Sequence, residues 1–117
     1  MNIPETHQTV MPYLMLYNAK AFIDFVENVF EAKLLFNLIA DHQKFSHAEI
    51  KIGISTIMFS EATIQWPAQT ANLFVYVENA DKTYIRAIKL GSSILMEIED
   101  KDYGRTCGVA DSFGNVW

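Results

Sequence analysis

Two ionisable residues, His47 and Glu49, stand two positions apart in a segment, 44–52, that alternates between aliphatic and polar or aromatic side chains. In a β-strand, residues two positions apart point to the same face, so the imidazole and the carboxylate are predicted to be neighbours. A neighbouring carboxylate can shift the pKa of a histidine across neutral pH. Metal-free acid–base catalysis requires a group whose pKa lies in this range. We expect the pair to meet a ligand, Lys51 or water, because glutamate is rarely buried without a partner.

The sequence contains little other reactive chemistry. Its single cysteine, Cys107, excludes a disulfide framework, a C-x-x-C redox pair and a multi-cysteine zinc site. In the internal repeat described below, this cysteine corresponds to Ser46, on a face expected to lie against a helix, which predicts a buried, unreactive thiol. No serine stands in a G-x-S-x-G elbow, and there is no glycine-rich phosphate loop. Whether the chain is an enzyme stays open on this basis.

Composition predicts a single globular domain. The chain has 117 residues (13.3 kDa), of which 50% are hydrophobic and 20% charged, so it can build a core without a disulfide or a metal. No apolar run approaches the roughly 18 residues of a membrane span. The N-terminal residues lack the basic and then apolar build of a signal peptide, and we therefore expect a cytoplasmic protein.

Charge limits the possible partners. Nine Lys and Arg residues against 14 Asp and Glu give a formal net charge of −5, and no stretch concentrates the basic residues. Nucleic acids and anionic membrane surfaces both require a basic face, so neither is expected as a partner. A neutral or cationic small molecule suits this field better.

The sequence repeats itself at an offset of about 61 residues, and such a repeat dictates the architecture. In both copies an expected strand leads through an Asn-Ala pair into an amphipathic helical pattern. The parts are strand 12–17, Asn18-Ala19 and helix 20–30 in the first copy, and strand 72–77, Asn79-Ala80 and helix 81–90 in the second. Further strands are expected at 33–40, 44–52 and 56–60, and at 93–98 and 106–110.

These elements predict an α+β fold of two tandem βαβββ modules in one domain, residues 1–117. The parts are module one at about 10–60, a linker at 61–71 and module two at about 72–117. At the repeat offset, Thr56 corresponds to Trp117, so the last strand is cut short at Trp117. We expect the natural protein to continue for about five to ten residues, the length of one strand.

Four motifs in order carry a resemblance to a known family. They are Pro12-Tyr13-Leu14 with the helical Ala21-Phe22-Ile23-Asp24-Phe25, the strand Phe45-Ser46-His47-Ala48-Glu49-Ile50, Tyr103-Gly104-Arg105 with Gly108-Val109, and the ending Asp111-Ser112-Phe113-Gly114-Asn115-Val116-Trp117. Together they resemble the PhnB-like subgroup of the glyoxalase/bleomycin-resistance/dioxygenase proteins in the vicinal oxygen chelate superfamily. The resemblance implies curved mixed sheets with a concave ligand cavity, and helices on the convex face.

On such a fold, alternation along each strand assigns residues to the cavity or to the helix layer. The ligand-binding set implied in this way is Tyr13, Phe45, His47, Glu49, Phe59, Asn72, Phe74 and Tyr76. In the strand that begins at Thr56, the same alternation exposes Ile57 and Glu61 beside Phe59. The alternative for the aromatic residues is a dimer interface or a filled core.

Arg105 joins the ligand-binding set through the resemblance, which implies that its loop borders the mouth of the cavity. A guanidinium there would pair with a ligand carboxylate or phosphate. The structural alternative is a salt bridge to Glu49 or Asp111.

The resemblance also locates the ligands of the metal-dependent relatives, which fall on Met11, Asn72 and the residue after Trp117. Methionine is a soft ligand and asparagine a poor one, so we expect no bound metal and no other cofactor. A metal enzyme would need His47 or Glu61 to recruit the ion.

Three functional hypotheses result. The leading one is a metal-free homodimer that binds an amphipathic or cationic small molecule in aromatic-lined cavities, each built by both subunits as the resemblance implies. The second is a metal-dependent lyase, dioxygenase or thiol transferase of the same superfamily. The third is a protein-interaction module whose concave face docks a peptide or a partner domain.

Overall fold

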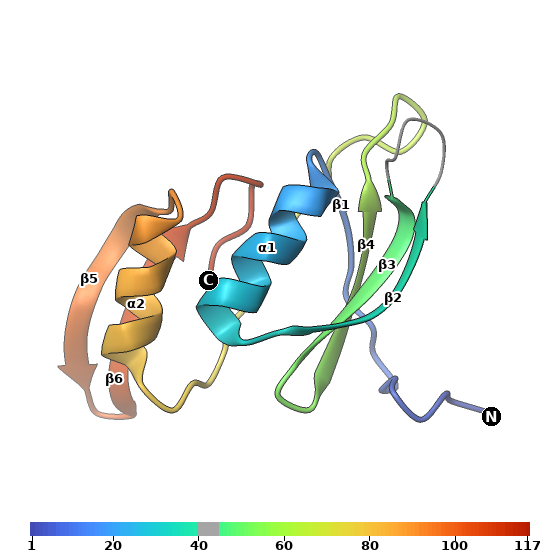
Figure 1. The fold of residues 1–117 in the computed structure, drawn as a ribbon. Helices are drawn as coiled ribbons and strands as arrows, with labels where there is room; N and C mark the ends of the chain where they lie inside the picture. The colour runs from blue at the N-terminus through green and yellow to red at the C-terminus, as the bar shows by residue number, and fades with distance from the viewer. Residues whose placement is uncertain (40–44) are drawn as a thin grey trace.

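The first half of the chain forms one helix and a four-stranded mixed sheet (Figure 1). The computed structural model describes residues 1–39 and 45–117, with side chains at all of these except Ile39 and Phe45. The elements are β1 (Tyr13–Leu16), α1 (Ala19–Phe30), β2 (Lys33–Ile39), β3 (Phe45–Ile52) and β4 (Ser55–Glu61). The strand order is β1-β4-β3-β2, in which β1 and β4 are parallel and the other pairs are antiparallel.

The second half forms α2 (Ala80–Lys89) and an antiparallel pair of strands, β5 (Ser93–Lys101) and β6 (Gly104–Ala110). The predicted strand at 72–77 is wrong, because only a single parallel bridge, from Asn72 to Val116, forms there. Val116 also bridges Ala110 in an antiparallel sense, so it lies between the two segments as β4 lies between β1 and β3.

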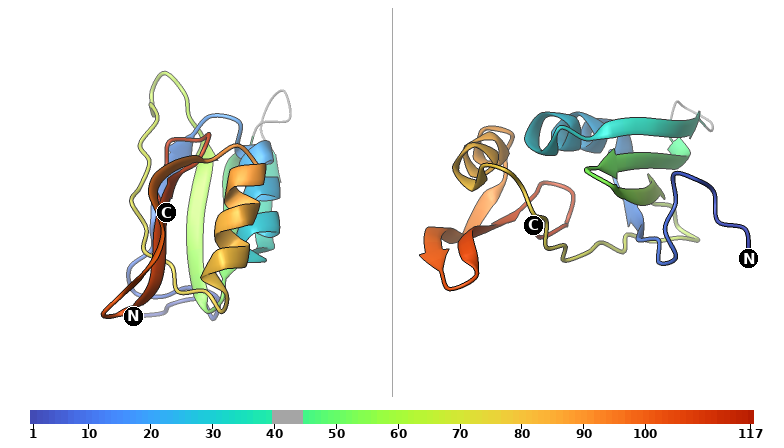
Figure 2. Two further views of the ribbon diagram at one scale, coloured as in Figure 1. Left: turned by 90° about the vertical axis from the view of Figure 1, so that its left-hand side faces the viewer. Right: turned by 90° about the horizontal axis from the view of Figure 1, so that it is seen from below.

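Both helices lie on the same side of the sheets, next to each other (Figure 2). Helix α1 buries Phe22, Val26 and Val29 at helical spacing and ends where Glu31 adopts a left-handed conformation (φ 56°). Asn79 caps the N-terminus of α2, where its side chain accepts a hydrogen bond from the Lys82 amide. Neither described helix is long and apolar enough to cross a membrane.

One core joins the two halves, and the Phe22 ring lies at its centre. This ring contacts Phe59 of β4 at 5.0 Å, and Phe113 and Trp117 of the C-terminal motif at 5.5 and 6.4 Å between ring centroids. Edge-to-face and stacked aromatic pairs at these distances stabilise a core beyond their buried area. The C-terminal motif therefore packs on the helix of the first half.

Asp111 organises that C-terminal motif. Its buried carboxylate accepts hydrogen bonds from the backbone amides of Phe113 and Asn115, both at 2.8 Å. It also accepts from the Asn115 side-chain amide at 3.0 Å and from the Trp117 indole N–H at 2.8 Å. Four donors converge on one carboxylate, which explains why the turn holds the indole against the core.

Candidate functional site

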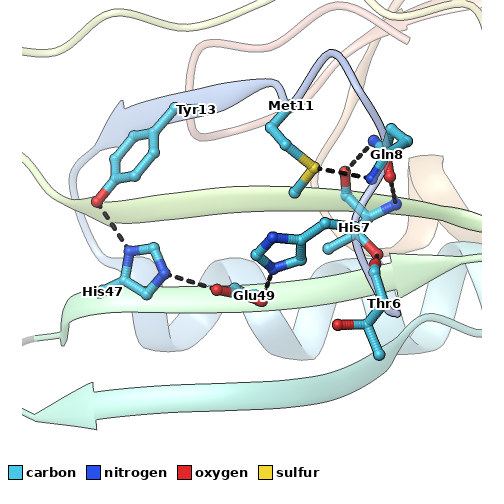
Figure 3. A network of polar contacts seen from close by, with 8 residues as sticks. Thr6, His7, Gln8, Met11, Tyr13, His47 and Glu49 are labelled. Atoms are coloured by element: carbon cyan, nitrogen blue, oxygen red, sulfur yellow. Dashed lines mark hydrogen bonds and ion pairs between the residues drawn. The ribbon is translucent and has the colours of Figure 1, made fainter. Parts of the chain in front are cut away.

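The face of the four-stranded sheet opposite α1, called the open face below, carries His47 and Glu49 side by side (Figure 3). Their neighbours Ala48 and Ile50 point the other way and are fully buried under α1. The alternation predicted for this strand is therefore confirmed in the structure.

A continuous polar chain crosses the open face: His7, Glu49, His47 and Tyr13 (Figure 3). His7 Nε2 lies 2.7 Å from Glu49 Oε1, and His47 Nε2 lies 2.8 Å from Glu49 Oε2. The Tyr13 hydroxyl lies 3.0 Å from His47 Nδ1. Because a carboxylate only accepts, both Nε2 atoms donate to it, and the Nδ1 of a neutral His47 accepts from Tyr13.

His7 is a member of this chain that the sequence did not reveal. The N-terminal segment lies against β4, where the Gln8 side chain donates to the Thr56 carbonyl at 2.7 Å and accepts from its amide at 3.2 Å. The Thr56 hydroxyl also donates to the Thr6 carbonyl. No periodic pattern precedes residue 12, so no sequence signal pointed to a segment docked in this way.

The electrostatics of the open face centre on Glu49, whose side chain is only 12% exposed. Burial by itself raises the pKa of this carboxyl, but hydrogen bonds from His47 and His7, together with their charge, outweigh burial and lower the pKa below its ordinary 4.5. Glu49 is therefore held as the carboxylate at neutral pH, as an acceptor for the two imidazoles.

Replacing Glu49 by glutamine is expected to lower the free energy of unfolding by about 1–2 kcal/mol at neutral pH, because charge-assisted hydrogen bonds become weaker neutral ones. A lowered folded-state pKa stabilises the protein above the ordinary value of 4.5 and loses that contribution as pH falls through the folded value. Urea unfolding of both proteins should therefore show the difference shrinking from about pH 7 to about pH 3. The exposed Glu97→Gln is the control, and an undiminished Glu49→Gln effect at low pH would contradict a role for the charge.

Exposed apolar side chains surround the polar chain. The rings of Tyr13 and Phe36 lie 5.5 and 5.9 Å from the His47 ring, and Phe36 is 49% exposed. Leu38, the cross-strand partner of His47, is 54% exposed. A band of hydrogen-bonding groups in an apolar surround is the usual composition of a small-molecule site.

Three other predicted residues lie in the second half, around a separate cavity of about 270 Å³. Phe74, Tyr76 and Arg105 line it together with Tyr103 and Trp117. Within the described part of the chain, no hydrogen bond or ring contact joins this group to the polar chain of the open face. The structure therefore divides the predicted site into two groups.

Arg105 is held by acidic neighbours. Its guanidinium donates to both carboxylate oxygens of Asp81, at 2.8 and 3.1 Å, and to Asp100 at 3.0 Å. Hydrogen bonds from this guanidinium lower the pKa of Asp81. A salt bridge is thus present, but its partners are neither Glu49 nor Asp111, because the hairpin of β5 and β6 turns the side chain toward the start of α2.

The placement of Phe59 and Ile57 on the cavity side is wrong. Phe59 is fully buried against Phe22, and Ile57 is buried beneath α1. The reason is the register: Phe59 pairs with Ala48, a residue of the helix side, whereas Met58 pairs with Glu49. The turn before β4 shifts the alternation by one residue relative to the prediction.

The remaining predicted residues have different outcomes. Glu61 accepts hydrogen bonds from the amides of Asn18 and Ala19 at 2.9 and 3.0 Å, so it caps α1. Asn72 is exposed and takes part in the bridge to Val116. The side chain of Phe45 lies outside the described residues.

Two residues considered as metal ligands make other contacts in the described part of the chain. The Met11 sulfur accepts a hydrogen bond from the Gln8 amide at 3.4 Å, and Glu61 is committed to the start of α1. Among residues 1–39 and 45–117, no three His, Cys, Asp or Glu side chains gather as metal ligands. Cys107 is half-buried, and burial raises the pKa of its thiol.

Comparison with solved structures identifies the fold. TioX from Micromonospora sp. ML1 superposes with a TM-score of 0.75 and 21% identity over 94% of both chains. A glyoxalase/bleomycin resistance protein from Streptomyces sp. CB03234 has a TM-score of 0.68 and 16% identity, covering 91% of this chain and 93% of its own. TnmS3, an antibiotic binding protein from the same strain, has a TM-score of 0.68 and 15% identity over 94% of both chains. The chain therefore shares the glyoxalase-like α+β fold of these structures.

A curated relative aligns with most of the chain. The uncharacterized protein Mb0911c of Mycobacterium bovis is 26% identical over 118 residues, which cover 91% of this chain and 78% of the relative. No protein-family model matches the chain.

Proposed function

We propose that the chain binds an amphipathic or cationic small molecule on the open face of the four-stranded sheet, without a metal. The observation that carries this proposal is the polar chain of His7, Glu49, His47 and Tyr13, set among exposed apolar side chains. Glu49 supplies a negative charge, and the Tyr13 hydroxyl supplies a group that both donates and accepts.

The exposed apolar side chains around the polar chain also contribute to ligand recognition. Aromatic faces such as those of Tyr13 and Phe36 attract planar and cationic groups. The formal net charge of −5 favours the approach of a cation over that of an anion. TnmS3, which shares the fold, is described as an antibiotic binding protein, and this supports the same class of activity here.

The open face also supports a homodimer as part of the proposal. Tyr13, Phe36 and Leu38 are 42%, 49% and 54% exposed, and a ligand held on such an open surface stays in contact with water. A second subunit that covers this surface would bury the apolar side chains and complete the cavity. Light scattering should then give about twice the mass of 13.3 kDa.

His47→Ala is expected to weaken the binding of ethidium, a planar cation, by about tenfold, because it removes one member of the polar chain and a ring from the ligand surface. Tyr13→Phe removes only a hydroxyl and should cost about threefold or more. Fluorescence titration of each variant measures both effects, with the anionic dye fluorescein as the probe for charge preference.

Tyr17→Phe is the matched control, since Tyr17 is 61% exposed and makes no contact with the polar chain within the described residues. The proposal fails if the two site variants bind ethidium as tightly as the wild type does. Loss of ethidium binding in Phe74→Ala alone would indicate that the ligand binds in the cavity of the second half instead.

A further inference from the structure

A second cleft, of about 700 Å³, lies between the two halves of the molecule. Its walls come from the end of α1, the beginning of β2, the turn between β3 and β4, and residues 76–79 with the first turns of α2. It is separate from the polar chain of the open face, none of whose members lines it.

Four basic residues line this cleft: Lys33, Lys51, Lys82 and Arg86. They are four of the nine Lys and Arg residues in a chain whose net charge is −5. Basic residues are therefore concentrated at this cleft although the protein as a whole is acidic. Two acidic residues, Glu31 and Glu78, also line it, which leaves a positive excess.

The basic side chains are incompletely neutralised. Lys33 and Lys51 are direct cross-strand partners on β2 and β3, an arrangement that destabilises a sheet when both residues carry the same charge. Arg86 approaches Glu31 only at 3.8 Å, and both side chains are exposed. Among the described residues, the three lysines form no ion pair.

Two further features favour an anion with an apolar body. The N-terminal end of α2, which carries a partial positive charge, lines the cleft, while Asp81 in its first turn is paired with Arg105. Phe30, Ile52 and Tyr76 add apolar wall beside the charges. A bound anion would relieve the repulsion between Lys33 and Lys51 and use the field of the helix.

We propose that this cleft binds a small organic anion, in which a phosphate or carboxylate is attached to an apolar group. The charged group lies between Lys33, Lys51 and Lys82, and the apolar group lies against Phe30 and Tyr76. This site takes a ligand of opposite charge from the one proposed for the open face, so the two can be tested independently.

Phenyl phosphate and benzoate are the probes, and phenol is their uncharged counterpart. In two-dimensional NMR titrations, we expect phenyl phosphate or benzoate to shift the backbone amides of Lys33, Lys51 and Lys82, with an affinity that falls as salt is added. The double variant Lys33→Gln/Lys51→Gln should weaken this binding by about tenfold or more. Its melting temperature should not fall, since the substitution removes a repulsive pair.

Lys20→Gln/Lys89→Gln is the matched control, because it removes the same charge from exposed helix positions outside the cleft. It should leave the affinity unchanged. Equal weakening in both double variants would overturn the proposal in favour of a general charge effect, as would phenol binding as tightly as the anions. Phenyl phosphate and benzoate compared at one salt concentration identify which anionic group the cleft prefers.

Discussion

Replacing Asp111 by alanine is expected to lower the free energy of unfolding by about 3–5 kcal/mol, because four hydrogen-bond donors lose their common acceptor. The donors are the amides of Phe113 and Asn115, the Asn115 side chain and the Trp117 indole, all within 3.0 Å of the carboxylate. Asn115 is fully buried, so water does not replace the lost acceptor there. The indole would also lose the contact that holds it beside Phe22.

Urea unfolding followed by tryptophan fluorescence measures this effect. Asp111→Asn keeps the size and one acceptor oxygen, and it should cost less than the alanine variant, about 1–3 kcal/mol. Asp102→Ala, in the exposed turn between β5 and β6, should change stability by less than about 0.5 kcal/mol. If Asp111→Ala is as stable as the wild type, ring packing alone holds the C-terminal motif in place.

Phe59→Ala is expected to destabilise the protein by about 3–5 kcal/mol, the usual cost of deleting a fully buried aromatic side chain. Its ring packs edge-to-face on Phe22 with centroids 5.0 Å apart, and the cavity left behind would lie between β4 and α1. The effect tests the register of β4, since a residue on the open face would cost far less.

Phe74→Ala is the matched control for that experiment, because the same side chain is removed from a position that is 66% exposed. It should cost less than about 1 kcal/mol. Ethidium binding by the folded fraction of Phe59→Ala should match the wild type, since this ring does not reach the open face. A small loss in Phe59→Ala together with a large one in Phe74→Ala would contradict the register seen here.

The contacts of Asp111 also explain part of the motifs that carry the family resemblance. Asp111, Asn115 and Trp117 serve the folding of the C-terminal motif, through hydrogen bonds and ring packing. Glu61 likewise holds the first amides of α1. These residues are therefore structural, whereas the proposed ligand surface uses His47 and Tyr13, whose side chains face away from the core.

Much of the fold followed from local pattern. The helical periodicity placed α1 and α2 within one residue of their observed ends. The alternation in β3 separated His47 and Glu49 from Ala48 and Ile50, because polar and aliphatic residues occupy alternate positions along this strand. Such patterns are decided by neighbours in the chain, so they can be predicted from sequence.

Only the tertiary structure decided the composition of the site. For β4 the prediction carried the parity of the other strands across the preceding turn, which placed Phe59 on the cavity side. Only the pairing with β3 showed that Phe59 faces the helix and that Met58 lies beside Glu49. His7 reaches Glu49 across 42 positions of sequence, and Arg105 reaches Asp81 across 24. These partners depend on how the N-terminal segment docks on the sheet and how the hairpin lies against α2. That arrangement is the outcome of packing between distant elements, which residue spacing along the chain does not encode.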